Sequence, residues 1–597
     1  MTWILIALIL VLVADSLRMR GRLTSIATLE PTEQVAGDHQ IVAAPGVTVT
    51  DSTRRSASAW AVAQGLDVVD LVPRDLPAIR AMSFAQLVDP AKYRKDRLGP
   101  GRTAGHAILV TTDVATRAQI KPPADEVEFV RLAARLKHFG RADVVVAPDE
   151  HARPFDLGRR FEILRVLLGP TTPAALVVLP VFWTIIGLGV WLRPIPGLVA
   201  LAIWHLQPLI AIAGTKIRSR DVVIVTLLRA PIELWMLVRT IFGHRDPADP
   251  VEARRAEYDR LIAGGTAGFF EARRQTCPVC DGRDLVVHLR NSDLMQHKPG
   301  VFTLERCRGC SHVFQNPRLS FAGLDYYYKD FYDGLGEAGM EFMFGFGAEP
   351  YYARARMMRE IVATPARWLD VGCGHGHFCI AARDELPGTS FDGLDMSESI
   401  DEATRRRWVD TGYRGLFPEL APQFAGKYDA VSMSHYLEHT LDPRVEIKAA
   451  HTALATNGHL MIEVPDPEFK LGRWLGRYWL PWFQPQHLNL LSVSNLERLL
   501  REGGFTPITW HRGQAHQRVD FFFAAWLVLN RLAPPRKLPW RWRGAGATAW
   551  RVVVWTLGSP LLVAGLIVDN VAGPLVFQRG RVSNTYRVVA RRGERTS

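Results

Sequence analysis

Cysteine is scarce in this sequence, with six in 597 residues. Four of the six form two C-x-x-C pairs, which argues against a disulfide framework and for a metal site in a reducing compartment. The sequence also lacks a strong excess of one charge, because Lys and Arg exceed Asp and Glu by only 12 (72 against 60). Much of this excess flanks apolar runs. We therefore expect a membrane as the partner and no nucleic-acid binding.

The first apolar run, Thr2–Ala14, is short for a membrane span. Its thirteen residues fall below the ~20 that cross a bilayer squarely. It has neither the preceding basic residues nor the following cleavage site of a secretory signal. Arg18, Arg20 and Arg22 come after it. We expect residues 1–22 to form a membrane anchor with its basic end in the cytoplasm.

Residues 23–170 are predicted to form a small α/β domain. Helical spacing marks Val127–Phe139, and β-rich runs occupy Gln40–Ala44, Leu66–Val72, Ala107–Thr111 and Ala142–Ala147. An α/β domain followed by membrane helices resembles membrane glycosyltransferases, but this part has no D-x-D pair to hold a metal-bound nucleotide. The alternative is a scaffold or a degenerate domain.

A transmembrane hairpin with an interfacial helix is expected over residues 171–243. Ala175–Leu192 and Ile195–Gly214 are long enough to span. Basic residues flank the pair on the expected cytoplasmic side: Arg159, Arg160, Lys216, Arg218 and Arg220. Asp221–Gly243 is apolar but contains Arg229, Glu233 and Arg239, which suits a helix lying in the interface. Residues 244–270 are interpreted as a linker.

The two cysteine pairs define a small module over residues 271–320. Its four candidate ligands are Cys277, Cys280, Cys307 and Cys310, with 26 residues between the pairs. Tetrahedral Zn²⁺ takes four such thiolates, and a closed site of this kind stabilises a fold without doing chemistry. His288, His297 and His312 are substitute ligands. A redox role is the alternative, but the βαβ setting of redox C-x-x-C motifs is missing around Cys277.

A glycine-rich turn follows an apolar strand that ends near Asp370. Gly372, Gly374 and Gly376 stand at alternate positions, so the backbone can approach a ligand closely. Phe391–Asp395 reads as a second strand ending in an acid, 25 residues after Asp370. This spacing suits a βαβ unit that presents a carboxylate to a ribose.

Together these motifs resemble class I S-adenosylmethionine-dependent methyltransferases of the type 11/23 kind that carry a zinc module. The resemblance covers residues 275–592 and rests on the cysteine pairs and on Tyr326–Tyr332, Asp370–Gly376, Tyr428–His439, Asn457–Pro465, Gln486–Ser492 and Leu499–Phe505. It implies an α/β fold with a Rossmann-like seven-stranded sheet over residues 321–597. The implied cofactors are S-adenosylmethionine and a structural Zn²⁺.

The resemblance also implies roles for individual residues. The cofactor-binding set is Asp370, Gly372, Gly374, Gly376, Asp395, Met396 and Ser434. The G-x-G-x-G spacing favours S-adenosylmethionine over NAD. Gly412–Phe417 stands where relatives often place an acid, so the adenine contacts stay unassigned.

The catalytic set is His439, Glu438 and His435, with His439 as the general base and His487 as a further rival. Two alternatives stay open. His439 can instead cap a helix or orient a loop, and some quinone O-methyltransferases with a similar rim use acids and a histidine to hold a metal.

Residues 519–578 form an apolar insertion between the sixth strand (Phe505–Arg512) and the seventh (Asn584–Arg592). Arginines and tryptophans alternate within it, which is typical of a surface at lipid headgroup level. The alternative is a hairpin packed on the enzyme's own core. A re-entrant hairpin over Val552–Val576 is a third reading.

The sequence thus predicts a multi-pass protein of a bacterial-type inner membrane, with a cytoplasmic methyltransferase acting on a lipid, a quinone or a lipid-linked sugar. One alternative is a sugar C- or O-methyltransferase that acts on a soluble nucleotide sugar. The other is a membrane glycan enzyme or scaffold with a non-catalytic S-adenosylmethionine-binding module.

Overall fold

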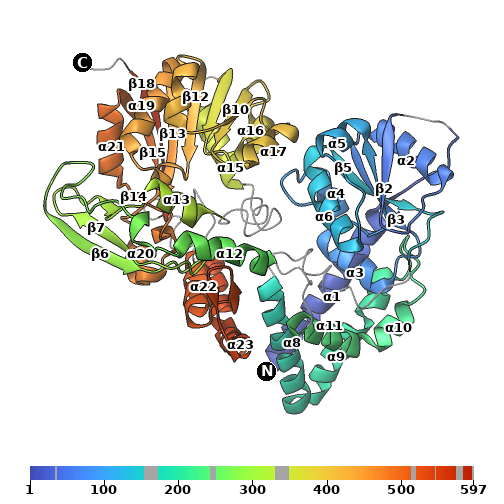
Figure 1. The fold of residues 1–597 in the computed structure, drawn as a ribbon. Helices are drawn as coiled ribbons and strands as arrows, with labels where there is room; N and C mark the ends of the chain where they lie inside the picture. Colours follow the sequence, from blue (N-terminus) through green and yellow to red (C-terminus); the bar gives the residue numbers. More distant parts are fainter. Residues whose placement is uncertain are drawn as a thin grey trace. The chain divides into compact units, whose positions relative to one another are not determined.

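The computed structural model describes residues 1–33, 37–153, 172–242, 250–329, 349–362, 364–512, 519–544, 546–572 and 583–593. The chain divides into two compact units, of which the first contains residues 1–245 and the second residues 246–336 and 347–597. Figure 1 shows the elements of both, and each unit is described by itself. Some expected features lie outside the described residues: Arg159, Arg160, residues 244–249, the end of the tyrosine-rich segment from Asp330 and residues 573–578 of the insertion.

The first unit contains a five-stranded sheet in the order β1-β5-β3-β4-β2. Its strands are β1 (Ala27–Thr28), β2 (His39–Ala43), β3 (Val68–Pro73), β4 (Ala107–Thr111) and β5 (Ala142–Ala147). Its helices are α2 (Asp51–Gln64), α3 (Ala78–Leu87), α4 (Pro90–Tyr93), α5 (Thr112–Arg117), α6 (Glu126–Leu136) and the 3₁₀ turn η1 (Lys137–Phe139). The four predicted strands and the predicted helix are present, whereas β1 is too short to be seen from periodicity.

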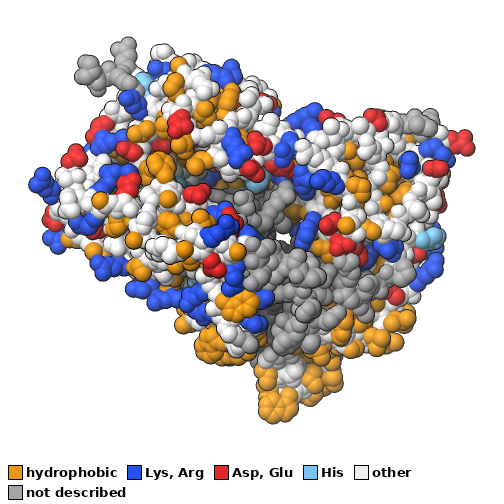
Figure 2. All heavy atoms as spheres, viewed as in Figure 1, with side chains coloured by type: hydrophobic (Ala, Val, Ile, Leu, Met, Phe, Trp, Pro, Cys, Tyr) orange, Lys and Arg blue, Asp and Glu red, His pale blue; other side chains and the backbone are white. Residues whose placement is uncertain are grey.

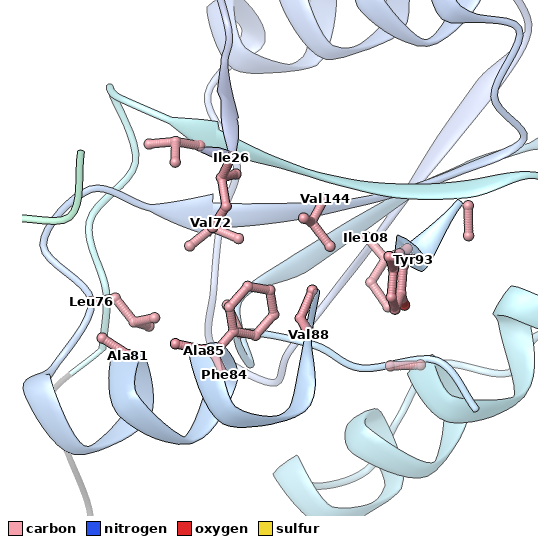
Figure 3. Close-up of a cluster of buried hydrophobic side chains, with 14 of the residues drawn as sticks. Ile26, Val72, Leu76, Ala81, Phe84, Ala85, Val88, Tyr93, Ile108 and Val144 are labelled. Atoms are coloured by element: carbon pink, nitrogen blue, oxygen red, sulfur yellow. The ribbon is translucent and has the colours of Figure 1, made fainter. Parts of the chain in front are cut away.

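Helix α3 covers one face of this sheet. Figure 3 shows Phe84 and Ala85 of α3, and Val88 directly after its end, pointing toward Val72 and Val144 of the strands. Burying such side chains contributes about 1.5–3 kcal/mol for each large one. The helix is thereby fixed on the sheet.

The remaining helices of the first unit are largely apolar: α1 (Thr2–Ser25), α8 (Thr172–Leu192), α9 (Pro194–Ile212), α10 (Val222–Leu227) and α11 (Arg229–Phe242). By length and composition, α1 and α9 can cross a membrane. The first run is therefore longer than its apolar residues indicated, because the helix continues through the three arginines. The segment from Asp221 breaks at Leu228 into α10 and α11, which lie below the length of a span.

The cysteine module forms part of the second unit. Its sheet has the order β14-β8-β7-β6, with β6 (Leu285–Asn291), β7 (Phe302–Cys307), β8 (Val313–Gln315) and β14 (Asn489–Leu490). Strand β14 comes from a segment almost 180 residues further along the chain and pairs antiparallel with β8. Helix α12 (Pro250–Ile262) occupies much of the expected linker, and its buried Tyr258 packs against Tyr326 of α13 (Phe321–Tyr328).

A seven-stranded sheet of order β11-β10-β9-β12-β13-β18-β15 forms the centre of the second unit. Its strands are β9 (Arg367–Val371), β10 (Ser390–Asp395), β11 (Gly412–Arg414), β12 (Tyr428–Ser434), β13 (Leu454–Pro465), β15 (Phe505–His511) and β18 (Thr585–Arg592). Strand β18 alone runs antiparallel to both neighbours, β13 and β15. The expected sheet, including its reversed last strand, is present.

Helices cover both faces of this sheet (Figure 1). One face carries α15 (Glu349–Ile361), α16 (His377–Glu385) and α17 (Ser399–Arg405). The other carries α18 (Phe417–Leu420), α19 (Pro443–Ala453) and α21 (Val493–Glu502). Alternation along β9 explains the two cores, because Trp368 points to the first face and Leu369 and Val371 to the second.

The insertion forms a helical hairpin of α22 (Asp520–Leu532) and α23 (Gly546–Ile567), and α23 continues as the π-helical turn η9 (Val568–Ala572). The short strands β16 (Lys537–Leu538) and β17 (Arg541–Trp542) pair between the two helices. Residues Gly546–Val571 are the third stretch long and apolar enough to cross a membrane.

Candidate functional site

The glycine turn begins where β9 ends and opens beside Asp395 of β10. Gly372, Gly374 and Gly376 have φ of 72°, 51° and 79°, values that favour glycine. A Cβ on Gly374 would meet no atom within 4 Å, so this backbone faces open space. The N–H of Gly374 donates to Oδ2 of Asp395 at 2.8 Å. The turn and the acid are thus held together at the carboxyl edge of the sheet, where open α/β folds bind ligands.

Asp395 uses part of its acceptor capacity within the protein. Its Oδ1 accepts hydrogen bonds from the backbone N–H (2.9 Å) and the hydroxyl (2.7 Å) of Ser397. A carboxylate offers about four acceptor positions, so the three bonds to Gly374 and Ser397 leave one for a ligand. Met396 is 66% exposed and free to face an adenine.

Two further members of the predicted cofactor set, the buried Asp370 and the half-buried Ser434, lie at the same edge. Asp370 accepts a hydrogen bond from Ser432 Oγ at 2.6 Å, and burial raises the pKa of Asp370 to about 7. Ser434 ends β12, and its buried hydroxyl has no hydrogen-bond partner among the described residues. A buried hydroxyl without a hydrogen bond is unfavourable, and a bound ligand can supply that bond. Both residues therefore fit a cofactor with polar groups.

The four cysteines of the module converge. The Sγ atoms of Cys277 and Cys310 are 3.6 Å apart, those of Cys280 and Cys307 are 3.5 Å apart, and all four lie within 4.8 Å of one another. Tetrahedral Zn²⁺ with bonds of about 2.3 Å would hold sulfurs about 3.8 Å apart. Burial raises the pKa of Cys277 to about 11. The donor set fits a zinc ion, which would also stabilise the thiolates.

At the other rim of the sheet edge, His439 lies in the 3₁₀ turn η6 (Leu437–His439). Its Nδ1 is 2.7 Å from Tyr328 Oη and 3.2 Å from the carbonyl oxygen of Gln486. In the tautomer that donates to this carbonyl, Nε2 carries the lone pair. Burial lowers the pKa of His439. The ring is therefore neutral near pH 7 and able to accept a proton.

His487 and Glu438 direct acceptor atoms toward His439. The Nδ1–H of His487 donates to Pro481 O at 2.7 Å, which leaves Nε2 unprotonated, and burial lowers its pKa to about 3. The buried Oε2 of Glu438 accepts no hydrogen bond from the described residues. One ligand atom from each of Glu438, His439 and His487 lies within 4.8 Å of the others. This trio has the chemistry of a divalent-cation site as well as that of a base with supporting groups.

His435 has a different environment from His439. It follows β12 with φ of 51°, and its ring lies 3.2 Å from both Glu438 Oε1 and Glu463 Oε1. Burial alone would lower its pKa, but the two carboxylates raise it to about 9. His435 is therefore protonated near neutral pH and unsuited to act as the general base. Its two ring nitrogens instead contact the carboxylates of Glu438 and Glu463.

Sequence reasoning missed two groups of the site. Glu463 is fully buried on β13 and binds Arg354 and Arg587 besides His435. The signal available for it was a lone acid in the apolar run Leu460–Val464. The contact between Tyr328 and His439 joins residues 111 positions apart. No local sequence pattern predicts a contact between residues so far apart.

Comparison with known proteins gives the following matches. Residues 349–509 match the family model described as "Methyltransferase domain". A ubiquinone biosynthesis O-methyltransferase from Acinetobacter baylyi is 35% identical over 165 residues, covering 24% of this chain and 68% of the relative. Another, from Marinobacter nauticus, is 35% identical over 103 residues, covering 16% of this chain and 42% of the relative.

The chain thus spans about two fifths of the length of the first curated relatives that it matches. Among solved structures, a SAM dependent methyltransferase from Archaeoglobus fulgidus is 18% identical and covers 42% of this chain and 97% of its own, with a TM-score of 0.28.

Proposed function

Because the chain belongs to the class I S-adenosylmethionine-dependent methyltransferases, we propose that it methylates a membrane-associated acceptor, namely a lipid, a quinone or a lipid-linked sugar, at the cytoplasmic face of a membrane. The observation that carries the proposal is the single sheet edge on which a glycine turn, Asp395 and a neutral His439 are positioned. Two apolar helices of the first unit and the apolar hairpin of the second support the membrane setting.

The chain's own residues account for cofactor binding. The Gly372–Gly376 turn would lie against the methionine part of the cofactor, and Asp370 would receive its amino group directly or through water. The remaining acceptor position of Asp395 would take a ribose hydroxyl. The unpaired hydroxyl of Ser434 would form a hydrogen bond with the cofactor. When bound, the cofactor supplies an electrophilic methyl group, so the protein has mainly to align the acceptor and remove its proton.

His439 is assigned the proton transfer. Its Nε2 accepts the proton of an acceptor hydroxyl, while Gln486 O and Tyr328 Oη hold the ring from the Nδ1 side. Glu438 stabilises the resulting imidazolium, because its carboxylate is kept ionised: burial opposes this, but His435 lowers the pKa of Glu438. Ion-pair stabilisation of this kind is stronger in a buried site than in water.

A hydroxyl on an apolar ring is favoured as the acceptor, because the relatives matched at 35% identity are named ubiquinone biosynthesis O-methyltransferases. The cysteine module is proposed to bind a structural Zn²⁺ that braces β6–β8 against the catalytic sheet. For residues 23–170 we propose a supporting role without separate chemistry.

The test combines binding with product analysis. Calorimetry with the full chain in detergent should show S-adenosylmethionine binding, and a deletion strain should lack lipid species that carry one extra CH₂ mass. Loss of a methylated nucleotide sugar with unchanged lipids would favour the soluble-sugar alternative. Failure to bind the cofactor would overturn the proposal.

A further inference from the structure

Helix α23 is long and apolar, and many of its side chains are exposed. Its inner stripe packs on α22 and consists of Trp555, Gly558, Ser559, Leu562 and Gly565. Gly558 and Gly565 allow close approach, because a Cβ there would collide with Leu529 and Phe522 of α22. The outward side chains are exposed and almost all apolar: Trp550, Val552, Val553, Leu557, Leu561, Val563, Leu566, Ile567 and Val571. Water-soluble monomers rarely expose apolar patches beyond a few hundred Å².

Both ends of the hairpin are bound to the same unit. At the tip, Trp540 Nε1 donates to Gln296 O at 3.0 Å, and Asn530 Nδ2 donates to Leu294 O at 2.9 Å. At the opposite end, Asp520 of α22 accepts from Trp479 Nε1 at 3.1 Å, and Asp569, just after α23, accepts the N–H of Phe522 in α22 at 2.9 Å.

These anchors decide how α23 can meet a bilayer. A spanning helix places its ends on opposite sides of a hydrocarbon core about 30 Å thick. A 26-residue stretch is about 39 Å long, and here its two ends are held, through α22 and the hairpin tip, to one polar unit. Gly546–Val571 can therefore lie along a membrane, whereas crossing it would break the anchors. The same anchors argue against a re-entrant hairpin.

The charge of the hairpin selects the kind of surface. From Phe521 to Val568 there is no Asp or Glu, and six basic residues lie toward the tip: Arg531, Arg536, Lys537, Arg541, Arg543 and Arg551. Trp542 and Trp550 are about half exposed beside them (46% and 54%). Figure 2 shows orange side chains with blue ones among them over this lower part of the second unit. Tryptophan and arginine beside an apolar helix face suit the headgroup layer of anionic lipid.

We propose that α23 lies in the plane of an anionic phospholipid bilayer and docks the methyltransferase unit on it through the face marked by Leu557 and Leu561. This contact is additional to any anchoring by α1 and α9. The purpose of this membrane contact, which is to bring the cofactor site to a lipid-borne acceptor, rests on the proposed function. The membrane contact itself needs neither the methyl donor nor the methyl acceptor.

The test is site-specific photocrosslinking in the full chain, reconstituted in vesicles of phosphatidylcholine with phosphatidylglycerol. Benzoylphenylalanine at position 557 or 561 should give lipid adducts detected by mass spectrometry. Matched controls are positions 445 and 508, where Val445 (46%) and Ile508 (47%) are exposed apolar residues elsewhere in the unit. These should give none. The double substitution Arg541→Gln and Arg543→Gln should lower the adduct yield at 557 about fivefold for each charge removed.

Equal lipid labelling at 557 and 445 would overturn the proposal, as would adducts at 557 only to the protein itself or to a second copy. Two positions are used so that one misfolded variant does not decide the result, and circular dichroism checks folding. Because no cofactor is added, lipid labelling together with absent S-adenosylmethionine binding would refute the proposed function alone.

Discussion

Tyr328 Oη lies 2.7 Å from Nδ1 of His439, and this contact joins the segment after the cysteine module to the rim of the catalytic sheet. Tyr328 is the last residue of α13, whose final carbonyls are fixed by the buried ammonium of Lys298. Lys298 Nζ donates to Tyr326 O at 2.7 Å and to Lys329 O at 2.6 Å. A cation at a helix C-terminus stabilises it. The loop that carries Lys298 therefore helps to hold the ring of the proposed base.

Replacing the proposed base should abolish most of the activity. We expect His439→Gln to lower kcat by about 10²- to 10⁴-fold, the range for loss of a general base, with the affinity for S-adenosylmethionine unchanged. His459→Gln, on β13, is the matched control and should keep full activity. Steady-state kinetics with labelled donor provide the measurement. If instead chelation abolishes activity and added Mg²⁺ restores it, the trio of Glu438, His439 and His487 acts as a metal site.

Cofactor binding should depend on pH through Asp370. Burial raises the pKa of Asp370 to about 7, so below pH 7 the free protein carries a proton there. An ammonium group requires the ionised carboxylate, so the affinity should rise about tenfold per pH unit up to pH 7 and level off above it. It should fall again above about pH 8, where an α-amino group loses its proton. Calorimetry between pH 5.5 and about 8 measures the slope, and Asp370→Asn should flatten it. A pH-independent affinity in the unsubstituted protein would contradict the assignment.

The catalytic sheet could be predicted because its signals are local. The glycine turn follows a strand, and Asp395 ends the next strand, so both reach one edge of a parallel sheet. The cysteine spacing likewise gave the module, but strand β14, which completes its sheet, comes from residues 489–490 and could not be assigned to it from sequence.

The two rim histidines differ in protonation state near neutral pH, and the sequence alone did not show this difference. His435 and His439 are four positions apart in one motif, and both are acceptable bases by residue type. The carboxylate of Glu438 in the same motif, together with that of Glu463 more than twenty residues away in the chain, makes His435 a cation. Likewise, length and composition make α23 a candidate span, whereas the hydrogen bonds at the tip and base of its hairpin, which no local pattern predicts, argue for an in-plane position.

Removing two cysteines from the module should release its metal and loosen the sheet that rests on it. We expect the double variant Cys277→Ser and Cys307→Ser to lose bound zinc and to unfold at a lower temperature, because a structural zinc site contributes directly to folding. Cys379→Ala, in the helix after the glycine turn, is the control and should keep the metal. Metal content by mass spectrometry and thermal unfolding are the measurements. An unchanged zinc content in the double variant would refute the site.

The buried carboxylate of Glu463 should be a large single contributor to the stability of the second unit. It binds Arg354 through Nε at 3.0 Å and Arg587 through Nε at 2.8 Å, and all three side chains are nearly inaccessible to solvent. Burial alone would raise its pKa, but the two guanidinium groups hold it well below the usual range. Glu463→Gln would leave two arginines buried without a counter-charge, at a cost of about 3–5 kcal/mol. Glu349→Gln removes an exposed partner of Arg356 and should change stability by less than about 1 kcal/mol. Denaturant unfolding of both variants in detergent makes the comparison, and equal small effects would show that the arginines find other partners.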